Sequence, residues 1–311
     1  MTAPQRPRIA RRALDGVLLL DKPIGLSSND ALIRAKRLYL AKKAGHTGTL
    51  DPLASGLLPL CFGEATKFSQ DLLEADKTYE ATMRLGVRTT TGDAEGEAAE
   101  TRDVSCDEAA VIDAMARFRG DIVQIPPMYS ALKRDGKPLY EYARAGQVVE
   151  REGRQVTIHV LDLIACALPD VTFRVTCSKG TYVRTLAEDI GEALGCGAHL
   201  VALRRTGVGA LTLEHAVTLD ALSDTTEPAR DAWLQPVDAL LSTFPEVQLD
   251  AEAARRFLHG QRLRLDELAI SQDVLKQSPR MRVYGEGRLL GVAKAGDGVL
   301  APERLVVSAA N

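Results

Sequence analysis

The residues best suited to catalysis lie in one glycine-rich stretch, GHTGTLDPLASG, at residues 45–56. Its glycines and its proline restrict the backbone to a tight path. Pro52 disfavours helical φ/ψ angles at Asp51, which places this carboxylate on a loop or directly before a helix. The ordinary structural interpretation is that Asp51 is a helix N-cap and Pro52 the first helical residue. A carboxylate held on such a loop can also act as a nucleophile, because it needs no activation beyond remaining ionised.

Two further stretches could place side chains beside a substrate. In CSKGTYVRTL (residues 177–186) a strand turns at Gly180 and enters a helix, with Tyr182 and Arg184 next to the turn. In KTYE (residues 77–80) Tyr79 falls in a predicted strand, where tyrosine usually packs in the core or at an edge. Arg184 taken alone is an ordinary surface or helix-terminal residue. Neither stretch decides a function by itself.

Composition excludes several classes of protein. The chain has 311 residues, 45% hydrophobic and 26% charged, which is typical of a globular protein with one large and one small domain or two comparable ones. Its longest apolar runs, such as residues 16–20 and 56–62, are far below the ~18 residues that a membrane span needs. The start of the chain lacks the apolar core of a secretory signal, although its arginines leave a mitochondrial presequence open.

Cysteine and histidine spacing predicts neither a disulfide framework nor a metal site. The five cysteines are odd in number and contain no CxxC pair, and the five histidines form no HxxxH or HExxH pattern. No dinucleotide-binding loop or P-loop is present either. We therefore expect no cofactor and no metal, and a reducing, cytoplasmic location.

Charge is distributed unevenly. The net charge of −3 argues against a protein coated in positive charge, but residues 33–43 carry five basic groups and no acid. Residues 247–311 carry ten basic and eight acidic groups. Nucleic-acid binding needs a local basic face rather than a basic total. The sequence permits such a face without proving it.

The elements that would position these residues follow from hydrophobic periodicity and turn signals. Residues 1–14 are predicted as a flexible tail, and residues 87–104 as an acidic loop. Residues 16–23, 78–86, 155–167 and 170–178 are predicted as strands, and residues 27–42, 107–119, 183–195 and 229–241 as helical, with Ser28 or Asn29 capping the first helix. After residue 245 short apolar runs alternate with glycine pairs, which predicts a small β-domain of about 65 residues.

Together the motifs resemble the bacterial tRNA pseudouridine synthase B (TruB) family. The resemblance covers roughly residues 15–300 and rests first on GHTGTLDPLASG and CSKGTYVRTL, which are highly specific strings. It also includes DKPIG (residues 21–25), GEATK (63–67), PPMYSALK (126–133), GAHL (197–200) and LRRT (203–206). One departure is Thr90, where the family often has an acid, while Asp93 of the same stretch is retained. This departure affects only the detail of that loop.

The resemblance implies a fold and a reaction. The fold would be mixed α/β (α+β), with a largely antiparallel sheet flanked by helices in residues 15–245. An RNA-gripping thumb would be inserted at about 126–152, and residues 246–311 would form a PUA-like β-barrel domain that binds RNA. The enzyme would be an isomerase that converts the T-loop uridine of tRNA (position 55 by tRNA convention) into pseudouridine. Its partner would be the tRNA T-arm stem-loop, with no DNA and no membrane, and balanced charge without heptads favours a monomer.

The resemblance also implies roles for single residues. Asp51 would be the catalytic nucleophile and Arg184 its partner. Tyr79 would stack on the flipped base. His46, Tyr182 and Leu203 would form the rest of the substrate pocket.

The chemistry agrees with these roles. Isomerisation of uridine involves no redox step and no group donor, so no cofactor is needed. A base inside a folded loop must be flipped out at a cost of about a few kcal/mol, and stacking on an aromatic ring returns ~1–3 kcal/mol.

Three other interpretations remain to be weighed. A non-catalytic RNA-binding or tRNA-chaperone protein would be expected to have lost Asp51, Tyr79 or Arg184, yet all are present. A guide-RNA-dependent relative is disfavoured by the thumb-like insertion and the compact C-terminal module. A carboxylate glycosidase would need a second catalytic acid near Asp51, and the motifs offer Arg184 and Tyr79 instead.

Overall fold

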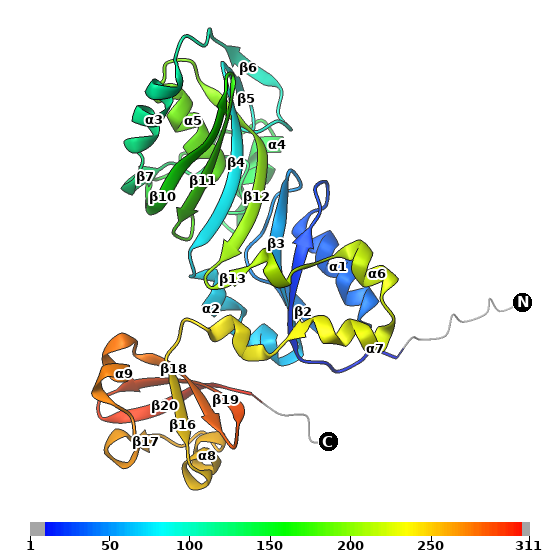
Figure 1. Cartoon of the computed structure of the whole chain (residues 1–311), viewed down its shortest axis with the longest axis vertical. Coiled ribbons are helices and arrows are strands. Elements are labelled where there is room, and N and C mark those ends of the chain that lie inside the picture. Colours follow the sequence, from blue (N-terminus) through cyan, green and yellow to red (C-terminus); the bar gives the residue numbers. More distant parts are fainter. Residues whose placement is uncertain (1–9, 307–311) are drawn as a thin grey trace, which may run out of the picture.

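The computed structural model describes residues 10–306, which contain two large β-sheets joined by short helical segments (Figure 1). The main path of the first sheet runs β14-β1-β3-β12-β4-β11-β10-β7, and β13, β15 and β2 pair with its members. Its strands are β1 (Gly16–Lys22), β2 (Ala44–His46), β3 (Ala54–Phe62), β4 (Lys77–Leu85), β7 (Gly120–Gln124), β10 (Arg154–Ala167), β11 (Asp170–Cys177), β12 (Ala198–Val208), β13 (Leu211–Thr212), β14 (Val217–Thr218) and β15 (Leu234–Gln235). Most neighbours are antiparallel, while β1–β14 and β3–β12 are parallel. The predicted mixed, largely antiparallel sheet is confirmed.

Helices cover this sheet and connect its strands. They are α1 (Ser28–Leu38), α2 (Ser69–Leu73), α3 (Glu108–Ala116), α4 (Leu139–Arg144), α5 (Val183–Ala193), α6 (Leu219–Asp224) and α7 (Glu227–Arg230). In Figure 1, α3 and α5 lie beside β10, β11 and β4, and α1 and α6 lie beside β1 and β3.

Side-chain directions along β1 show that this part of the sheet is covered on both faces. Leu18 and Leu20 pack into one buried cluster with α1 and α6, while Val17 and Leu19 pack into a different cluster. A strand with apolar side chains on both faces must be buried on both faces. The apolar run at residues 16–20 is therefore an interior strand, as predicted.

Helix α1 begins one residue earlier than its predicted caps suggest. Ser27 is the N-cap, and its side chain accepts a hydrogen bond from the Asp30 amide. Ser28, predicted as a cap, is buried and bonds Leu50 instead. The prediction of Ser28 or Asn29 is wrong because Ser28 is needed by a neighbouring loop.

Three other local predictions also change. The predicted loop at 87–104 contains a hairpin of β5 (Val87–Thr89) and β6 (Ala98–Thr101). The predicted helical stretch at 229–241 is broken into α7, short 3₁₀ turns and β15. The predicted flexible tail must be shortened, because Arg12 bonds the backbone of Leu40 and Lys42; residues 1–9 of that tail lie outside the described residues.

The C-terminal part forms the second sheet, in the order β16-β18-β19-β20-β17. Its strands are β16 (Glu246–Leu249), β17 (Leu263–Arg264), β18 (Arg280–Gly285), β19 (Arg288–Gly296) and β20 (Val299–Leu305), with helices α8 (Ala251–Leu258) and α9 (Gln272–Gln277). The sheet curls around its own apolar cluster in the manner of a half-barrel (Figure 1). Arg280 also pairs with Asp71 of α2 at 2.7 Å, which ties this sheet to the rest of the chain.

Within residues 10–306, no helix is both long enough and apolar enough to cross a membrane. The same part of the chain contains no group of three or more His, Cys, Asp or Glu residues arranged to hold a metal ion.

Candidate active site

Asp51 lies on the irregular loop between β2 and β3, not at the start of a helix. Its carbonyl accepts a hydrogen bond from the Ala54 amide at 3.0 Å, which makes a tight turn over Pro52. The N-cap interpretation is therefore wrong, and the loop placement is confirmed. Pro52 keeps Asp51 out of helical φ/ψ angles, and the chain enters strand β3 at Ala54 instead of a helix, which leaves the carboxylate on a turn.

Neighbouring elements fix the loop on both sides of Asp51. The hydroxyl of Ser28 donates to the Leu50 carbonyl at 2.9 Å, and the Leu50 amide donates back to that hydroxyl at 2.7 Å. The Gly25 amide donates to the Pro52 carbonyl at 2.8 Å. The DKPIG string and the start of α1 thus hold the backbone that carries Asp51.

Arg184 lies beneath this carboxylate, near the start of α5. Its Nη2 is 3.0 Å from Asp51 Oδ2, and its Nη1 is 3.2 Å from Asp93 Oδ2. It also donates to the carbonyls of Thr91 and Tyr129 at 3.0 and 2.8 Å. These four acceptors fix the guanidinium plane, so its orientation toward Asp51 does not depend on a bound substrate.

Asp93 is a second carboxylate of the site that the sequence alone did not reveal as functional. Its side chain is 4% exposed, and it accepts hydrogen bonds from the Thr91 hydroxyl and the Glu95 amide. In the sequence it is one acid among several in a polar stretch. Nothing in that stretch separates a buried partner of Arg184 from its solvated neighbours.

A cavity of about 170 Å³ opens in front of Asp51. Five of the six predicted site residues line it, namely Asp51, Tyr79, Tyr182, Arg184 and Leu203. Its remaining walls come from residues around the loop, the insertion and the start of α5, namely Thr49, Leu50, Ser130, Ala131, Thr181 and Val183. The cavity combines apolar walls with one ion pair, the mixture typical of a small-molecule site.

The two tyrosines carry neutral hydroxyls. Burial raises the pKa of Tyr79, and the Arg205 guanidinium beside it opposes that shift. Burial likewise raises the pKa of Tyr182. The Tyr182 backbone is held at both polar groups by Gln124, whose side chain accepts from its amide and donates to its carbonyl.

His46 does not line the cavity. It ends β2 opposite Leu60, and its side chain is half-buried. Burial and the Arg205 cation both lower its imidazole pKa, so the ring is neutral at pH 7. The sequence-based grouping of His46 with the other five residues is thus not reproduced in the cavity wall.

Comparison with known proteins agrees with this geometry. The family profile described as "TruB family pseudouridylate synthase (N terminal domain)" matches residues 36–183. Two C-terminal profiles, "tRNA pseudouridylate synthase B C-terminal domain" and "Pseudouridine synthase II TruB, C-terminal", match residues 184–242 and 245–306. The chain is 80% identical over 310 residues to the tRNA pseudouridine synthase B of Burkholderia mallei, covering 99% of both chains. The chain belongs to the TruB family.

Further relatives extend the TruB comparison. The tRNA pseudouridine synthase B of Cupriavidus metallidurans is 66% identical, with 98% of each chain covered. Among solved structures, a chain of an H/ACA RNP bound to a substrate RNA containing 2′-deoxyuridine matches with a TM-score of 0.72 and 27% identity, covering 93% of this chain and 84% of that one. A chain of a Cbf5-Nop10-Gar1 complex matches with a TM-score of 0.71 and 28% identity, covering 93% and 84%. The expected family resemblance is confirmed, and the chain is a pseudouridine synthase, an isomerase that acts on RNA.

The insertion expected at about 126–152 borders the TruB cavity directly. It contains a short hairpin of β8 (Lys133–Arg134) and β9 (Lys137–Pro138), followed by α4. Ser130 and Ala131 line the cavity in front of Asp51, and the Tyr129 carbonyl accepts a hydrogen bond from Arg184. A movement of this insertion would therefore change a hydrogen bond that holds the Arg184 guanidinium.

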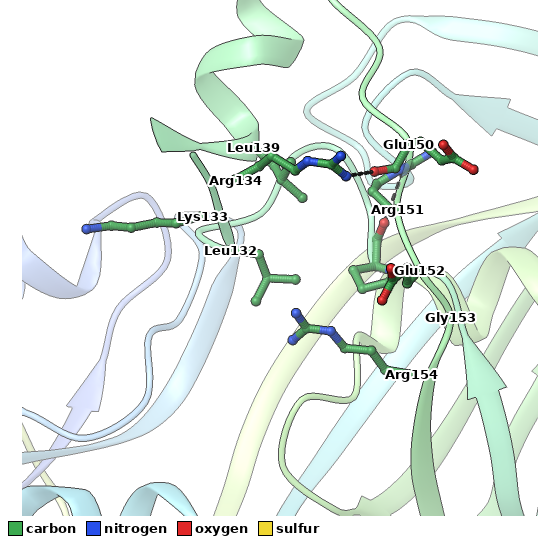
Figure 2. A pocket seen from close by; sticks show the side chains of 10 residues that line it. Leu132, Lys133, Arg134, Leu139, Glu150, Arg151, Glu152, Gly153 and Arg154 are labelled. Carbon is green, nitrogen blue, oxygen red and sulfur yellow. Dashed lines mark hydrogen bonds between the residues drawn. The ribbon is translucent and has the colours of Figure 1, made fainter. Parts of the chain in front are cut away.

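A second cavity of about 250 Å³ lies at the base of the insertion (Figure 2). Arg151 donates to the Pro126 carbonyl at 3.0 Å, which joins the two ends of the insertion, and Arg134 of the hairpin donates to the Glu150 carbonyl at 2.8 Å. In Figure 2 the guanidinium of Arg154 points from the end of β10 toward Leu132. The lining of this second cavity contains four basic and two acidic side chains, and Arg154 lies near enough to Tyr182 to affect its pKa.

Proposed function

We propose that this chain isomerises the T-loop uridine of tRNA, position 55 by convention, to pseudouridine with Asp51 as nucleophile. One observation carries the proposal: Asp51 is 47% exposed in the cavity, while the Arg184 cation that pairs with it is only 7% exposed. The buried guanidinium holds one carboxylate oxygen of Asp51 in place by a charge-assisted contact at 3.0 Å. The exposed side of Asp51 remains available to a substrate.

The reaction balances without an external reagent. The bond between uracil N1 and the ribose anomeric carbon breaks, the ring turns, and a bond forms from C5 to the same carbon. The C5 proton leaves to solvent and N1 gains a proton. Asp51 could attack the ribose carbon, attack the uracil ring, or remove a ribose proton, and all three routes require an ionised carboxylate at this position.

The cavity walls supply the remaining requirements. A flipped uracil would stack on Tyr79, which is worth about 1–3 kcal/mol and offsets part of the cost of unstacking. Tyr182 and Leu203 would close the pocket around the ring. His46, outside the cavity wall, would contact the RNA around the flipped base instead.

We further propose how the rest of the chain meets the RNA. Residues 15–245 would be the catalytic domain, with the thumb at about 126–152 gripping the T-arm stem-loop through its basic side chains. Residues 246–311 would be a PUA-like RNA-binding domain. The chain would act in the cytoplasm, as a monomer and without a guide RNA.

A T-arm RNA hairpin tritiated at C5 of its uridines tests this function. The pure protein should release tritium from this hairpin and leave an anticodon-arm hairpin of the same tRNA unchanged. Release from both hairpins would contradict T-arm specificity. Tight binding of the T arm without any release would favour the RNA-chaperone interpretation.

A further inference from the structure

Arg205, on β12, is an arginine buried without an acidic partner. Its exposed fraction is 1%, and within residues 10–306 no carboxylate forms an ion pair with it. Arg204, the preceding residue, points to the other face of the strand and pairs with Asp21. Because burial of an uncompensated charge is unfavourable, the position of Arg205 needs another explanation.

Hydrogen bonds from Arg205 to backbone carbonyls explain its burial. Nε of Arg205 donates to the Leu57 carbonyl at 2.7 Å, and Nη2 donates to the Gly48 carbonyl at 3.1 Å. These two carbonyls lie on opposite sides of Asp51 in the chain. A single planar guanidinium therefore joins the two ends of the loop that carries the carboxylate.

Two glycines of the same motif make room for this arginine. Gly56 has φ of +99°, and a Cβ there would lie 2.2 Å from the Arg205 carbonyl oxygen. Gly48 has φ of +73°, and a Cβ there would lie 3.3 Å from Arg205 Nη1. The glycines of GHTGTLDPLASG thus serve close approach to Arg205 as well as a tight turn.

Tyr79 completes the arrangement. It is the registered partner of Arg205 across β4 and β12, so both side chains stand on the same face of the sheet. The Arg205 guanidinium lies close enough to the Tyr79 hydroxyl to oppose the rise in its pKa that burial causes. The other ionisable groups facing Tyr79 are Cys177 on β11 and Asp51 on the loop.

We propose that Arg205 is a positioning residue of the catalytic centre, which fixes both ends of the Asp51 loop and orients Tyr79 against the same cavity. The inference rests on the proposed function only for its kinetic consequence. Arg205 does not line the cavity, whose wall includes Leu203 of the same strand and Tyr79. Its loss should therefore lower the rate of the chemical step and leave RNA affinity nearly unchanged.

The test uses Arg205→Lys, which keeps the charge but cannot bond both carbonyls, and Arg205→Met, which removes both. Single-turnover tritium release and the RNA dissociation constant are measured for each in the full chain. We expect Arg205→Lys to slow release by ~10–100-fold, because loop misplacement of about 1 Å costs about that much, and we expect Arg205→Met to slow it further. Arg174→Lys, which alters an exposed pair with Glu80 on the adjacent strands, is the matched control and should release tritium at the wild-type rate.

Two further readouts separate positioning from general destabilisation. Tyr79→Phe combined with Arg205→Lys should be less than additive in rate, because both changes disrupt one arrangement. Hydrogen–deuterium exchange of the peptide spanning residues 47–58 should rise in Arg205→Lys, while exchange in β18 and β19 stays at the wild-type level. The exchange measurement does not require activity. It therefore tests whether Arg205 fixes the Asp51 loop even if the wild type releases no tritium.

Unchanged exchange in residues 47–58 of Arg205→Lys would contradict the proposal that Arg205 fixes both ends of the Asp51 loop. Additive effects of Tyr79→Phe and Arg205→Lys, or equal losses of rate and affinity, would overturn the positioning role. If Arg205→Met does not fold, Arg205→Lys alone decides the question.

Discussion

Arg184 Nη2 lies 3.0 Å from Asp51 Oδ2, and the two members of this ion pair differ sevenfold in exposure, at 7% and 47%. The cation is fixed by the protein, and the carboxylate faces the cavity. Breaking such a pair by removing one partner is far more costly than the pair is stabilising, because the buried charge is left behind. The arrangement therefore fixes one oxygen of Asp51 against a buried cation and leaves the rest of the carboxylate accessible.

Asp93 is predicted to control the orientation of Arg184. Asp93→Asn removes the carboxylate that holds Nη1 at 3.2 Å, so the guanidinium should turn and misplace Asp51. We expect the single-turnover rate to fall by at least ~10-fold, together with a lower melting temperature. Glu97→Gln, an exposed acid of the same segment, is the control. A wild-type rate in Asp93→Asn would show that Arg184 does not need its second carboxylate.

Gly56 is predicted to be essential for stability. Gly56→Ala places a Cβ 2.2 Å from a backbone oxygen at φ of +99°, so β3 and β12 must separate. We expect the free energy of unfolding to fall by at least about 2 kcal/mol, measured by denaturant titration. Gly45→Ala in the same motif meets no atom within 4 Å and should change stability little. Equal stability of the two variants would contradict the close approach seen at Arg205.

Lys22 is predicted to make stability rise with pH in the alkaline range. It is completely buried and donates to the carbonyls of Pro23 and Leu26. Burial, and to a smaller extent the Arg205 cation, lowers its pKa from 10.5 to about 8, although Asp51 opposes the shift. The folded chain therefore loses this proton at a lower pH than the unfolded chain does. The burial penalty is fully present below pH 8 and is relieved between about pH 8 and 10.5.

The comparison of wild type with Lys22→Met isolates this contribution. From about pH 8 to 10 the free energy of unfolding of the wild type should rise relative to that of the variant, by at most ~1.4 kcal/mol per pH unit. Lys42→Met, which removes an exposed lysine, should show no such difference from wild type. Parallel curves for wild type and Lys22→Met would refute the assignment.

Regular alternation explains which elements could be predicted from the sequence. The strand expected at 155–167 is β10, and the one expected at 170–178 is β11, each within one residue at either end. Their alternating patterns reflect a sheet buried on one face. The helix expected at 183–195 is α5, which ends at Ala193. Gly195, just beyond its end, has the left-handed backbone conformation that is typical of a helix C-terminus.

Strand β12 shows what local pattern could not predict. It joins β3 to β4 at the centre of the large sheet, yet its sequence contains Arg204 and Arg205 side by side. One is compensated by an ion pair and the other by backbone carbonyls, and both partners are far away in the chain. Likewise β6 is fully exposed and rests on cross-strand pairs such as Arg88 with Glu100, so its acidic sequence indicated a loop.

In the candidate site too, some features could be predicted from local sequence and others could not. Pro52 and the glycines were enough to place Asp51 on a loop. The grouping of Asp51 with Tyr79 and Arg184 came from the family resemblance, because the contacts join three distant segments. The family pattern includes Asp93 but assigns it no role, since burial and not sequence distinguishes it from nearby acids.

The C-terminal sheet is predicted to add RNA affinity without affecting chemistry. Arg255 and Arg262 are exposed, and within the described residues neither forms an ion pair. Arg255→Glu combined with Arg262→Glu should weaken tRNA binding by at least ~10-fold with a smaller salt dependence. Release from saturating bound RNA should stay within about twofold of wild type. Unchanged affinity for full-length tRNA would argue against an RNA-binding role of residues 246–311.

The central claim is that Asp51 performs the isomerisation without a cofactor. Tritium release from the C5-labelled T-arm hairpin should be measured for wild type and Asp51→Asn, with no added metal or nucleotide. The account predicts release by wild type and none by Asp51→Asn, whose RNA affinity should stay within about tenfold because the cavity walls are retained. Release by Asp51→Asn at a rate near that of wild type would contradict the account.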